Sequence, residues 1–210
     1  MTSDNGEAFT PGRGGRTPIT TTARISHVAF ELFVTQGYEN TTVDQIAEAC
    51  GIGRRTLFRY FPSKNDIPWG DFDSLLHHFQ QVLRQTDPQW PLHEALKVAI
   101  IEFNTFPPEE TLYHRKRMDL LLSVPSLLGH STLRYEGWRQ VIQEFVSERL
   151  GVSPDSLEAR LIAWVSLGIS LASYELWLAD PYAHLPDLLA HGFDTLESLL
   201  EARGVSLSGR

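Results

Sequence analysis

Two arginines and a threonine stand together directly after a glycine-rich turn. Gly51-Ile52-Gly53 is followed at once by Arg54-Arg55-Thr56. Arginine can donate two parallel hydrogen bonds to O6 and N7 of guanine, and threonine can contact a thymine methyl group or a base edge. Because consecutive residues spread over most of a helical turn, two of these side chains are expected to read bases and the third to meet a phosphate. The alternative is a solvated basic helix face without a ligand.

Two short helices are expected to hold this cluster in position. Thr42-Val43-Asp44-Gln45 is typical of a capping box that begins a helix, with Ile46 and Ala47 on its inner face. The next helix covers about residues 54–61 and stops before Pro62. Two helices joined by a tight turn form a helix-turn-helix, whose second helix enters the major groove of DNA with its N-terminus first.

Further side chains around this motif are expected to contact the DNA backbone. They are the hydroxyls of Thr41 and Thr42, the hydroxyl of Tyr60, and the ammonium group of Lys64. Arg13 and Arg16 lie on a polar, glycine-rich arm that spans residues 1–18, and can reach into a minor groove. The alternatives are simple packing for Tyr60 and an arm without a role for the two arginines.

Charge is distributed unevenly along the 210 residues, whose net charge is −8. Residues 1–64 carry seven basic and six acidic side chains, whereas the rest of the chain carries 11 and 20. A polyanion is therefore expected to meet only the N-terminal part, because the acidic remainder repels it. The single cysteine, Cys50, excludes an internal disulfide framework and a cysteine-rich zinc site, and it falls on the apolar face of its helix.

The remainder of the sequence predicts an all-α fold. A first helix is capped by a threonine at positions 20–22 and ends at Gly37. Beyond Ser63 we expect helices at about residues 66–85, 91–106, 109–124, 127–150, 156–178 and 186–202, and no strand. Three units follow from this pattern, namely a basic arm at 1–18, a helix-turn-helix domain at 19–65 and a helical ligand-binding and dimerisation domain at 66–210.

The last two predicted helices are expected to form a subunit interface. Residues 161–178 are apolar nearly all round, which is more typical of a helix buried in protein than of a membrane span. Gly168 and Ala172, four positions apart, allow close helix approach. The predicted interface residues are Gly168, Leu171, Ala172, Leu189, Phe193 and Leu196. The alternative is that these helices are ordinary core.

The sequence around the turn resembles that of the TetR family of bacterial repressors. The resemblance rests on residues 42–52, with Thr42, Ile46 and Gly51, and on Thr56-Leu57-Phe58-Arg59-Tyr60-Phe61-Pro62-Ser63-Lys64. It covers about residues 20–66, and the stretch 52–73 more narrowly resembles the TetR-type regulators of mycofactocin systems. The resemblance implies a cytoplasmic homodimer, a near-palindromic DNA operator, regulation of mycofactocin-related genes, and release by a small-molecule effector. The family often has tyrosine where Phe58 stands, and Phe58 cannot carry its phosphate contact.

The resemblance also implies an effector pocket in the C-terminal domain, and bulky or amphipathic side chains are the candidates to line it. They are Trp69, Phe72, His77, Phe103, Phe106, His114, Met118, Leu122, Trp138, Trp164 and Tyr174. Arg115-Lys116-Arg117, with Arg134 and Arg139, can hold an anionic head group such as the phosphates of an acyl-CoA. We therefore expect an apolar or acyl-type effector, and no cofactor or bound metal.

Three other classes of function are weaker alternatives. An enzyme is disfavoured because His184 and His191 lack a glutamate at a metalloprotease spacing, and no phosphate-binding loop or G-x-S-x-G motif occurs. A metal-sensing regulator of the same family is a second alternative. A helical interaction module that does not bind DNA is the third, and it predicts that removing Arg54 and Arg55 changes nothing on DNA.

Overall fold

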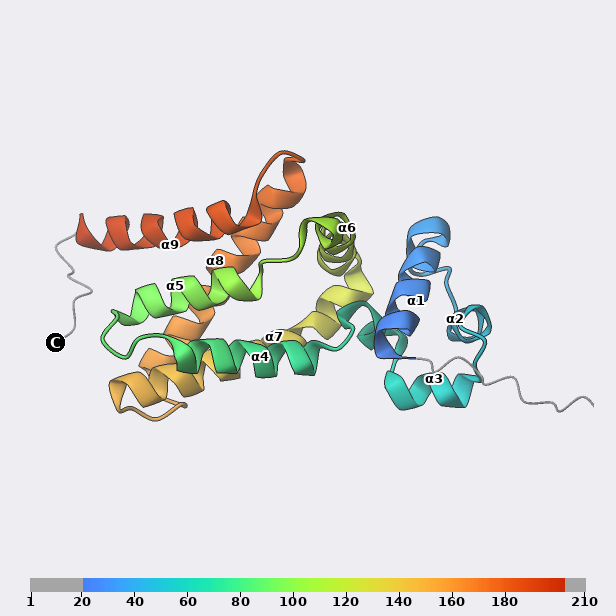
Figure 1. Ribbon diagram of the computed structural model, residues 1–210, viewed down its shortest axis with the longest axis horizontal. Helices are drawn as coiled ribbons and strands as arrows, with labels where there is room; N and C mark the ends of the chain where they lie inside the picture. The colour runs from blue at the N-terminus through green and yellow to red at the C-terminus, as the bar shows by residue number, and fades with distance from the viewer. Residues whose placement is uncertain (1–20, 203–210) are drawn as a thin grey trace, which may run out of the picture.

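The computed structural model describes residues 21–202, all of whose regular elements are helices. They run in the order α1 (Thr22–Gln36), α2 (Val43–Ala49), α3 (Arg54–Tyr60), η1 (Lys64–Trp69), α4 (Phe72–Gln85), α5 (Leu92–Phe103), α6 (Pro108–Ser123), α7 (Pro125–Leu150), α8 (Leu157–Ala179) and α9 (Leu185–Glu201). Helices α1 to α3 form a head at one end of the molecule, and α9 lies farthest from it (Figure 1). The all-α prediction is confirmed. The predicted arm at 1–18, with Arg13 and Arg16, lies outside the described residues.

The head forms as its local sequence dictates. The Thr21 hydroxyl accepts a hydrogen bond from the Arg24 N–H at 3.2 Å and begins α1. Thr42 and Gln45 make both bonds of the predicted capping box at the start of α2. Gly51 turns the chain between α2 and α3 with φ at +67°, a region that disfavours any residue with a Cβ. The inner faces of the three helices then meet in a hydrophobic core that continues into the C-terminal helices.

The segment from residue 66 to residue 85 is two elements, and its prediction as one helix was wrong. Ser63 and Asp66 form a capping box that begins the 3-10 helix η1, which contains Pro68. Because proline has no N–H to donate, it does not support a continued α-helical ladder there. Gly70 then breaks the chain direction with φ at +61°, and Asp71 caps α4 by accepting the Ser74 N–H. The chain therefore changes direction between the head and α4, and we call this segment, residues 64–71, the joint.

The C-terminal helices pack as one bundle beyond this joint. Helix α7 packs against α4, α6 and α8, while α9 packs against α8 and α5. The observed ends lie within a few residues of those predicted, and the predicted break at Pro125 is the boundary between α6 and α7, where Pro125 is the first residue of α7. Proline is tolerated there because the first N–H groups of a helix have no partner within the helix. The bundle encloses a cavity on the side that faces the head.

Candidate nucleic-acid interface and effector pocket

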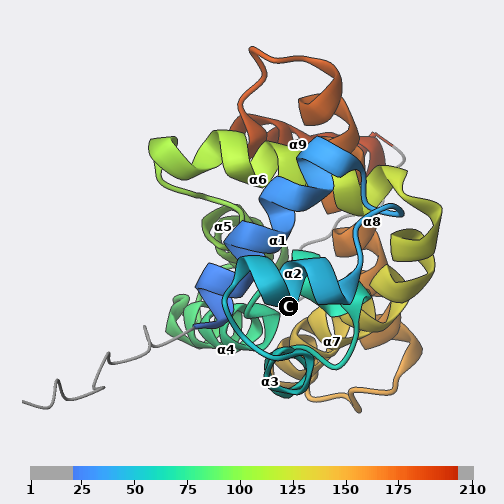
Figure 2. The ribbon, with the colours of Figure 1, turned by 90° about the vertical axis from the view of Figure 1, so that its right-hand side faces the viewer.

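Helix α3 presents its N-terminal arginines to solvent at the edge of the head. Figure 2 shows the head end-on, with α3 at its lower margin. Arg54 is exposed, but its guanidinium bonds to Asp44 of α2 at 3.0 Å and lies 5.5 Å from the centre of the Phe58 ring. Arg55 is also exposed, and it makes no ion pair or hydrogen bond with the residues described here. Thr56 is half-buried. Arg55 is therefore the more available of the two arginines.

The two threonines before α2 have different surroundings. Thr41 is 1% exposed, and its hydroxyl donates to the carbonyl of Gly37 at 2.9 Å. It does not fit the predicted phosphate contact, because its side chain is used to close the loop between α1 and α2. Thr42 is exposed, and its hydroxyl belongs to the capping box with Gln45.

Lys64 is attached to the same loop. Its ammonium group donates to the carbonyls of Tyr38 and Thr41, at 3.0 and 3.1 Å, and lies 4.2 Å from the centre of the Tyr38 ring. The sequence predicts a phosphate contact for Lys64, and the structure adds a structural role, with one N–H left for a phosphate. Tyr60 is half-buried at the end of α3 and packs against the core.

Replacing Lys64 with alanine is expected to lower the free energy of unfolding by about 1–3 kcal/mol, because two carbonyls lose a charged donor. Affinity for operator and for scrambled DNA is expected to fall together, since this position reads no base. Urea unfolding and DNA titrations at several salt concentrations measure the two effects. A loss of affinity confined to the operator would contradict this expectation.

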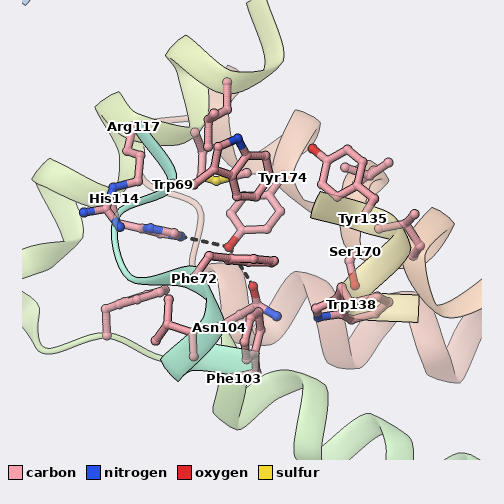
Figure 3. Close-up of a pocket in the computed structure, with 16 residues that line it drawn as sticks. Trp69, Phe72, Phe103, Asn104, His114, Arg117, Tyr135, Trp138, Ser170 and Tyr174 are labelled. Carbon is pink, nitrogen blue, oxygen red and sulfur yellow. Dashed lines mark hydrogen bonds between the residues drawn. The ribbon is translucent and has the colours of Figure 1, made fainter. Parts of the chain in front are cut away.

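Eight of the eleven predicted pocket residues line a single cavity in the bundle (Figure 3). They are Trp69, Phe72, Phe103, Phe106, His114, Met118, Trp138 and Tyr174. The cavity has an empty volume of about 680 Å³, including the part that opens to solvent. Its walls are mostly aromatic and aliphatic, which is typical of a small-molecule site.

Three predicted residues lie elsewhere. His77 and Trp164 are exposed on the surfaces of α4 and α8, and half-buried Leu122 lies off the cavity. Residues that the prediction did not assign to the pocket complete the wall, namely Leu75, Asn104, Arg117, Leu121, Tyr135, Leu167, Ser170 and Leu171. Helical spacing carried a signal for several of them, because Leu167, Leu171 and Tyr174 recur at intervals of four and three on one face of α8.

The predicted anion site does not assemble. Arg115 donates to backbone carbonyls of Trp177 and Asp180, and its guanidinium lies over the Trp177 ring. Arg134 binds Asp66 and Asp73, and Arg139 lies 3.7 Å from the centre of the Trp164 ring. Arg117 alone among these arginines lines the cavity. The basic side chains therefore point to separate partners and not to one head group.

A buried carboxylate joins the head to the bundle beside the cavity. Asp66 of η1 accepts hydrogen bonds from His130 and Arg134 of α7, at 2.8 and 2.7 Å, and from Ser63. Burial alone would raise the pKa of Asp66, but hydrogen bonds from Ser63, Arg134 and His130 outweigh it and hold the pKa below its ordinary value. Trp69, three residues further along η1, lines the cavity. A ligand that moves Trp69 therefore acts on the element that carries Asp66.

A second connection runs through α6. Tyr113 packs against His27 and Phe30 of α1, with ring centroids 5.5 and 4.6 Å apart. The next residue, His114, lines the cavity, and the Arg117 guanidinium lies 4.8 Å from the centre of the Tyr113 ring. Consecutive side chains of one helix thus contact the head and the pocket.

Comparisons with known proteins agree with this architecture. Residues 25–67 match the family model of bacterial regulatory proteins of the tetR family, and residues 90–201 match that of the MftR C-terminal domain. A Mycobacterium tuberculosis relative named MftR, for mycofactocin biosynthesis transcriptional regulator, is 44% identical over 189 residues, which cover 90% of this chain and 96% of the relative. The chain belongs to the TetR family of transcriptional regulators. TcmR of Streptomyces glaucescens is 28% identical over 196 residues, covering 90% of this regulator and 87% of that protein.

Solved structures show the same TetR fold. FadR of Bacillus subtilis, crystallised with stearoyl-CoA, aligns with a TM-score of 0.59 at 17% identity, covering 84% of this chain and 97% of that chain. FadR of Thermus thermophilus, crystallised with lauroyl-CoA, aligns with a TM-score of 0.56 at 21% identity, covering 84% and 93%. At these identities the likeness establishes the fold of this TetR-family regulator.

The predicted interface residues of the regulator divide into two groups. Gly168 and Ala172 are exposed on α8, in one stripe with Leu157, Leu161 and Leu176. In contrast, Leu189 and Phe193 are buried in the chain's own core, and Leu171 lines the cavity. Leu189 and Phe193 do not fit the predicted subunit contact, because α9 uses their face to pack against α8. A Cβ added at Gly192 would lie 2.7 Å from Ile169, which shows how closely the two helices approach. Leu196 is half-buried.

Helix α8 is long and apolar enough to cross a membrane by length and composition alone. In the regulator one side of α8 packs against α7 and α9, with Ser166, Ser170 and Ser173 buried, while the stripe that contains Leu161 and Leu176 is exposed. No cluster of three or more His, Cys, Asp or Glu side chains suited to a metal ion occurs within residues 21–202.

The buried histidine of the pocket is expected to make the regulator sensitive to acid. Burial, aided by the charge of Arg117, lowers the pKa of His114 to about 3, whereas an unfolded histidine titrates near 6.5. The neutral form therefore stabilises the fold fully above pH 6.5, and this contribution is lost as the pH falls toward 3. Between pH 7 and pH 4, the His114→Phe variant is expected to lose less stability than the wild type, by on the order of 3 kcal/mol. Urea unfolding at both pH values measures the difference, and parallel losses in the two proteins would disprove the assignment.

Proposed function

We propose that this TetR-family regulator represses mycofactocin-related genes by binding a near-palindromic operator as a homodimer, and that an apolar, acyl-type effector releases it. The observation that carries the proposal is the direct connection between an apolar cavity and a DNA-reading head, through Trp69 and Asp66 of η1. The protein acts in the cytoplasm, where such an operator is accessible.

On the DNA side, the exposed N-terminus of α3 supports base reading. Arg55 reads a guanine, and Arg54 joins it once the DNA competes with Asp44 for its guanidinium. Thr56, the third residue of this cluster, contacts a phosphate, as do Thr42, Tyr60 and Lys64. The likeness to the mycobacterial MftR over nearly the whole chain supports the choice of target genes.

On the dimer side, the exposed stripe of α8 supports pairing of two copies. Leu157, Leu161, Trp164, Gly168, Ala172 and Leu176 recur every three or four residues on one face. Leu161 is 56% exposed and Leu176 is 60% exposed, which is costly for a leucine in water. Nothing lies within 4 Å of a Cβ built at Gly168, so a partner helix can approach closely at that point.

On the effector side, the apolar cavity and its single lining cation support an acyl group near an anionic centre. The two FadR structures, which were crystallised with acyl-CoA esters, make an acyl-CoA the first compound to test. Release requires that the effector bind the state with displaced heads more tightly than the DNA-bound state. Contacts of the effector with Trp69 and His114 supply this difference in affinity. Trp69 lies on η1, which forms the joint, and His114 lies on α6, which contacts the head.

A mobility-shift assay tests the proposal. The probes are the intergenic DNA upstream of the gene itself and a scrambled control, each with and without a panel of acyl-CoA esters. We expect selective binding of the intergenic probe and its release by at least one ester. Selective binding that no ester affects would remove the acyl-CoA part and keep the regulator. If the protein does not bind the intergenic probe selectively, its binding sites are mapped across the genome. A protein that binds no site selectively in that search would overturn the repressor itself.

A further inference from the structure

A chain of three buried side chains crosses one end of the cavity. The Asn104 amide donates from Nδ2 to the carbonyl of Ile100 at 2.7 Å, which directs its oxygen toward Tyr174. The Tyr174 hydroxyl donates to that oxygen at 2.6 Å. His114 Nε2 lies 2.8 Å from the same hydroxyl. Figure 3 shows both contacts of the tyrosine.

The order of donors in this chain fixes the tautomer of His114. A phenol has one proton, and Tyr174 has given it to Asn104, so its oxygen must accept from His114. Nε2 therefore carries the ring proton, and Nδ1 is a bare acceptor. Burial raises the pKa of Tyr174 above its usual range, so the phenol keeps the proton that it donates.

Nδ1 of His114 has no partner in the described structure. The atom is buried without a hydrogen bond, and the residue as a whole is 7% exposed. An unpaired buried acceptor is costly, and sites of this kind are commonly satisfied by a ligand or water. The ring is held rigidly, because Phe106 stacks on it with centroids 3.9 Å apart and Trp177 packs at 5.7 Å.

Nδ1 of His114 does not become protonated near neutral pH, so it does not turn into a hydrogen-bond donor. Burial and the neighbouring Arg117 keep the imidazole neutral, with a pKa of about 3. Among the residues of the described part of the chain that line the cavity, Arg117 is the one strongly charged side chain and none is a carboxylate. Nδ1 therefore remains an acceptor and attracts a neutral donor.

We propose that the pocket selects effectors that present a neutral hydrogen-bond donor, such as a hydroxyl group, to Nδ1 of His114. A thioester, ester or ether has only acceptor atoms and leaves Nδ1 unpaired. The inference deepens the proposed function, on which its biological meaning rests, by requiring that the acyl-type effector also present a neutral hydrogen-bond donor. His114 is the specificity-determining residue, and Tyr174 and Asn104 are positioning residues that set its tautomer.

A matched pair of small probes tests the selection. 4-Hexylphenol carries a donor, and 4-hexylanisole replaces that proton with a methyl group. Trp69 and Trp138 line the cavity, so the intrinsic fluorescence of the full-length protein reports binding without DNA. We expect the phenol to bind about tenfold more tightly or better, as expected for a bond to a buried acceptor. Equal affinities would overturn the proposal.

Two substitutions locate the preference at Nδ1. His114→Asn places an amide oxygen near the position of Nδ1 and is expected to keep the preference for the phenol. His114→Phe keeps the aromatic stack with Phe106 and is expected to abolish it. A preference that survives in a folded His114→Phe protein would mean that another group binds the donor, and the proposal would be wrong.

A measurement on the wild-type protein keeps the test independent of how these variants fold. Long-range ¹H–¹⁵N correlation spectra distinguish protonated from bare ring nitrogens, and Nδ1 of His114 is expected to be bare at pH 7. A proton on Nδ1 would overturn the proposal. Neither experiment uses DNA, so a failed operator assay and a failed ligand preference are separate results.

Discussion

A protein that carries both Leu161→Glu and Leu176→Glu is expected to be a folded monomer that binds operator at least about 100-fold more weakly than the wild type. Each leucine is more than half exposed in the single chain, so its replacement removes little core packing. In the proposed dimer the same face is buried, and four glutamates would meet there without partners. A monomer also loses the gain from binding two half-sites at once, which is commonly 10²–10⁴-fold.

A protein that carries both Leu112→Glu and Leu133→Glu is the matched control. These leucines are 63% and 65% exposed on α6 and α7 and are not part of the α8 stripe, so their replacement adds the same charge elsewhere. Sedimentation analysis gives the mass in solution, and fluorescence anisotropy gives the affinity for operator DNA. A dimeric double variant would exclude the α8 stripe as the subunit interface. Monomers that bind with full affinity would exclude the dimer as the DNA-binding form.

Arg55→Ala is expected to remove most of the discrimination between operator and scrambled DNA. One bidentate arginine–guanine contact is worth about 1–3 kcal/mol, and a symmetric dimer loses two, or about 2–6 kcal/mol in all. The fold should be unaffected, because Arg55 is exposed and makes no ion pair with any described residue. Competition titrations with both DNA sequences at one salt concentration measure the ratio of affinities.

Arg84→Ala provides the control for charge. Arg84 is exposed in the last turn of α4, and its removal changes the net charge by the same amount. It should leave the discrimination ratio unchanged. Unchanged discrimination in Arg55→Ala itself would assign base reading to other residues. Arg54→Ala is a less clean test, because it also leaves Asp44 without its partner.

Local rules explain why the head could be predicted from the sequence. Caps such as Thr42 with Gln45, and turns such as Gly51, act within a few residues, so each boundary is encoded where it occurs. The same holds for most ends of the later helices. The joint at η1 was missed because Pro68 is compatible with the first turn of an α-helix, and only the combination with Gly70 excludes one continuous helix.

The site was harder to predict because its residues meet through tertiary packing. Large aromatic side chains were sound candidates for the pocket wall, but composition could not separate Trp138, which is buried, from Trp164, which is exposed. Similarly, a lysine after a recognition helix suggests a phosphate contact, and only the folded loop shows that Lys64 bonds to two carbonyls. The orientation of Asn104 and the tautomer of His114 depend on three helices at once.

Tyr113 and His114 are neighbours in the sequence, yet one contacts the head and the other lines the pocket. This arrangement constrains how a regulator of this design acquires a new effector during evolution. Under the proposed function, substitutions in this turn of α6 would change ligand choice and head position together, so they would be exposed to selection on both. Phe103, Leu167 and Leu171 lie on α5 and α8, which pack within the bundle. New effector preferences should therefore arise first at these three positions, whose helices pack within the bundle.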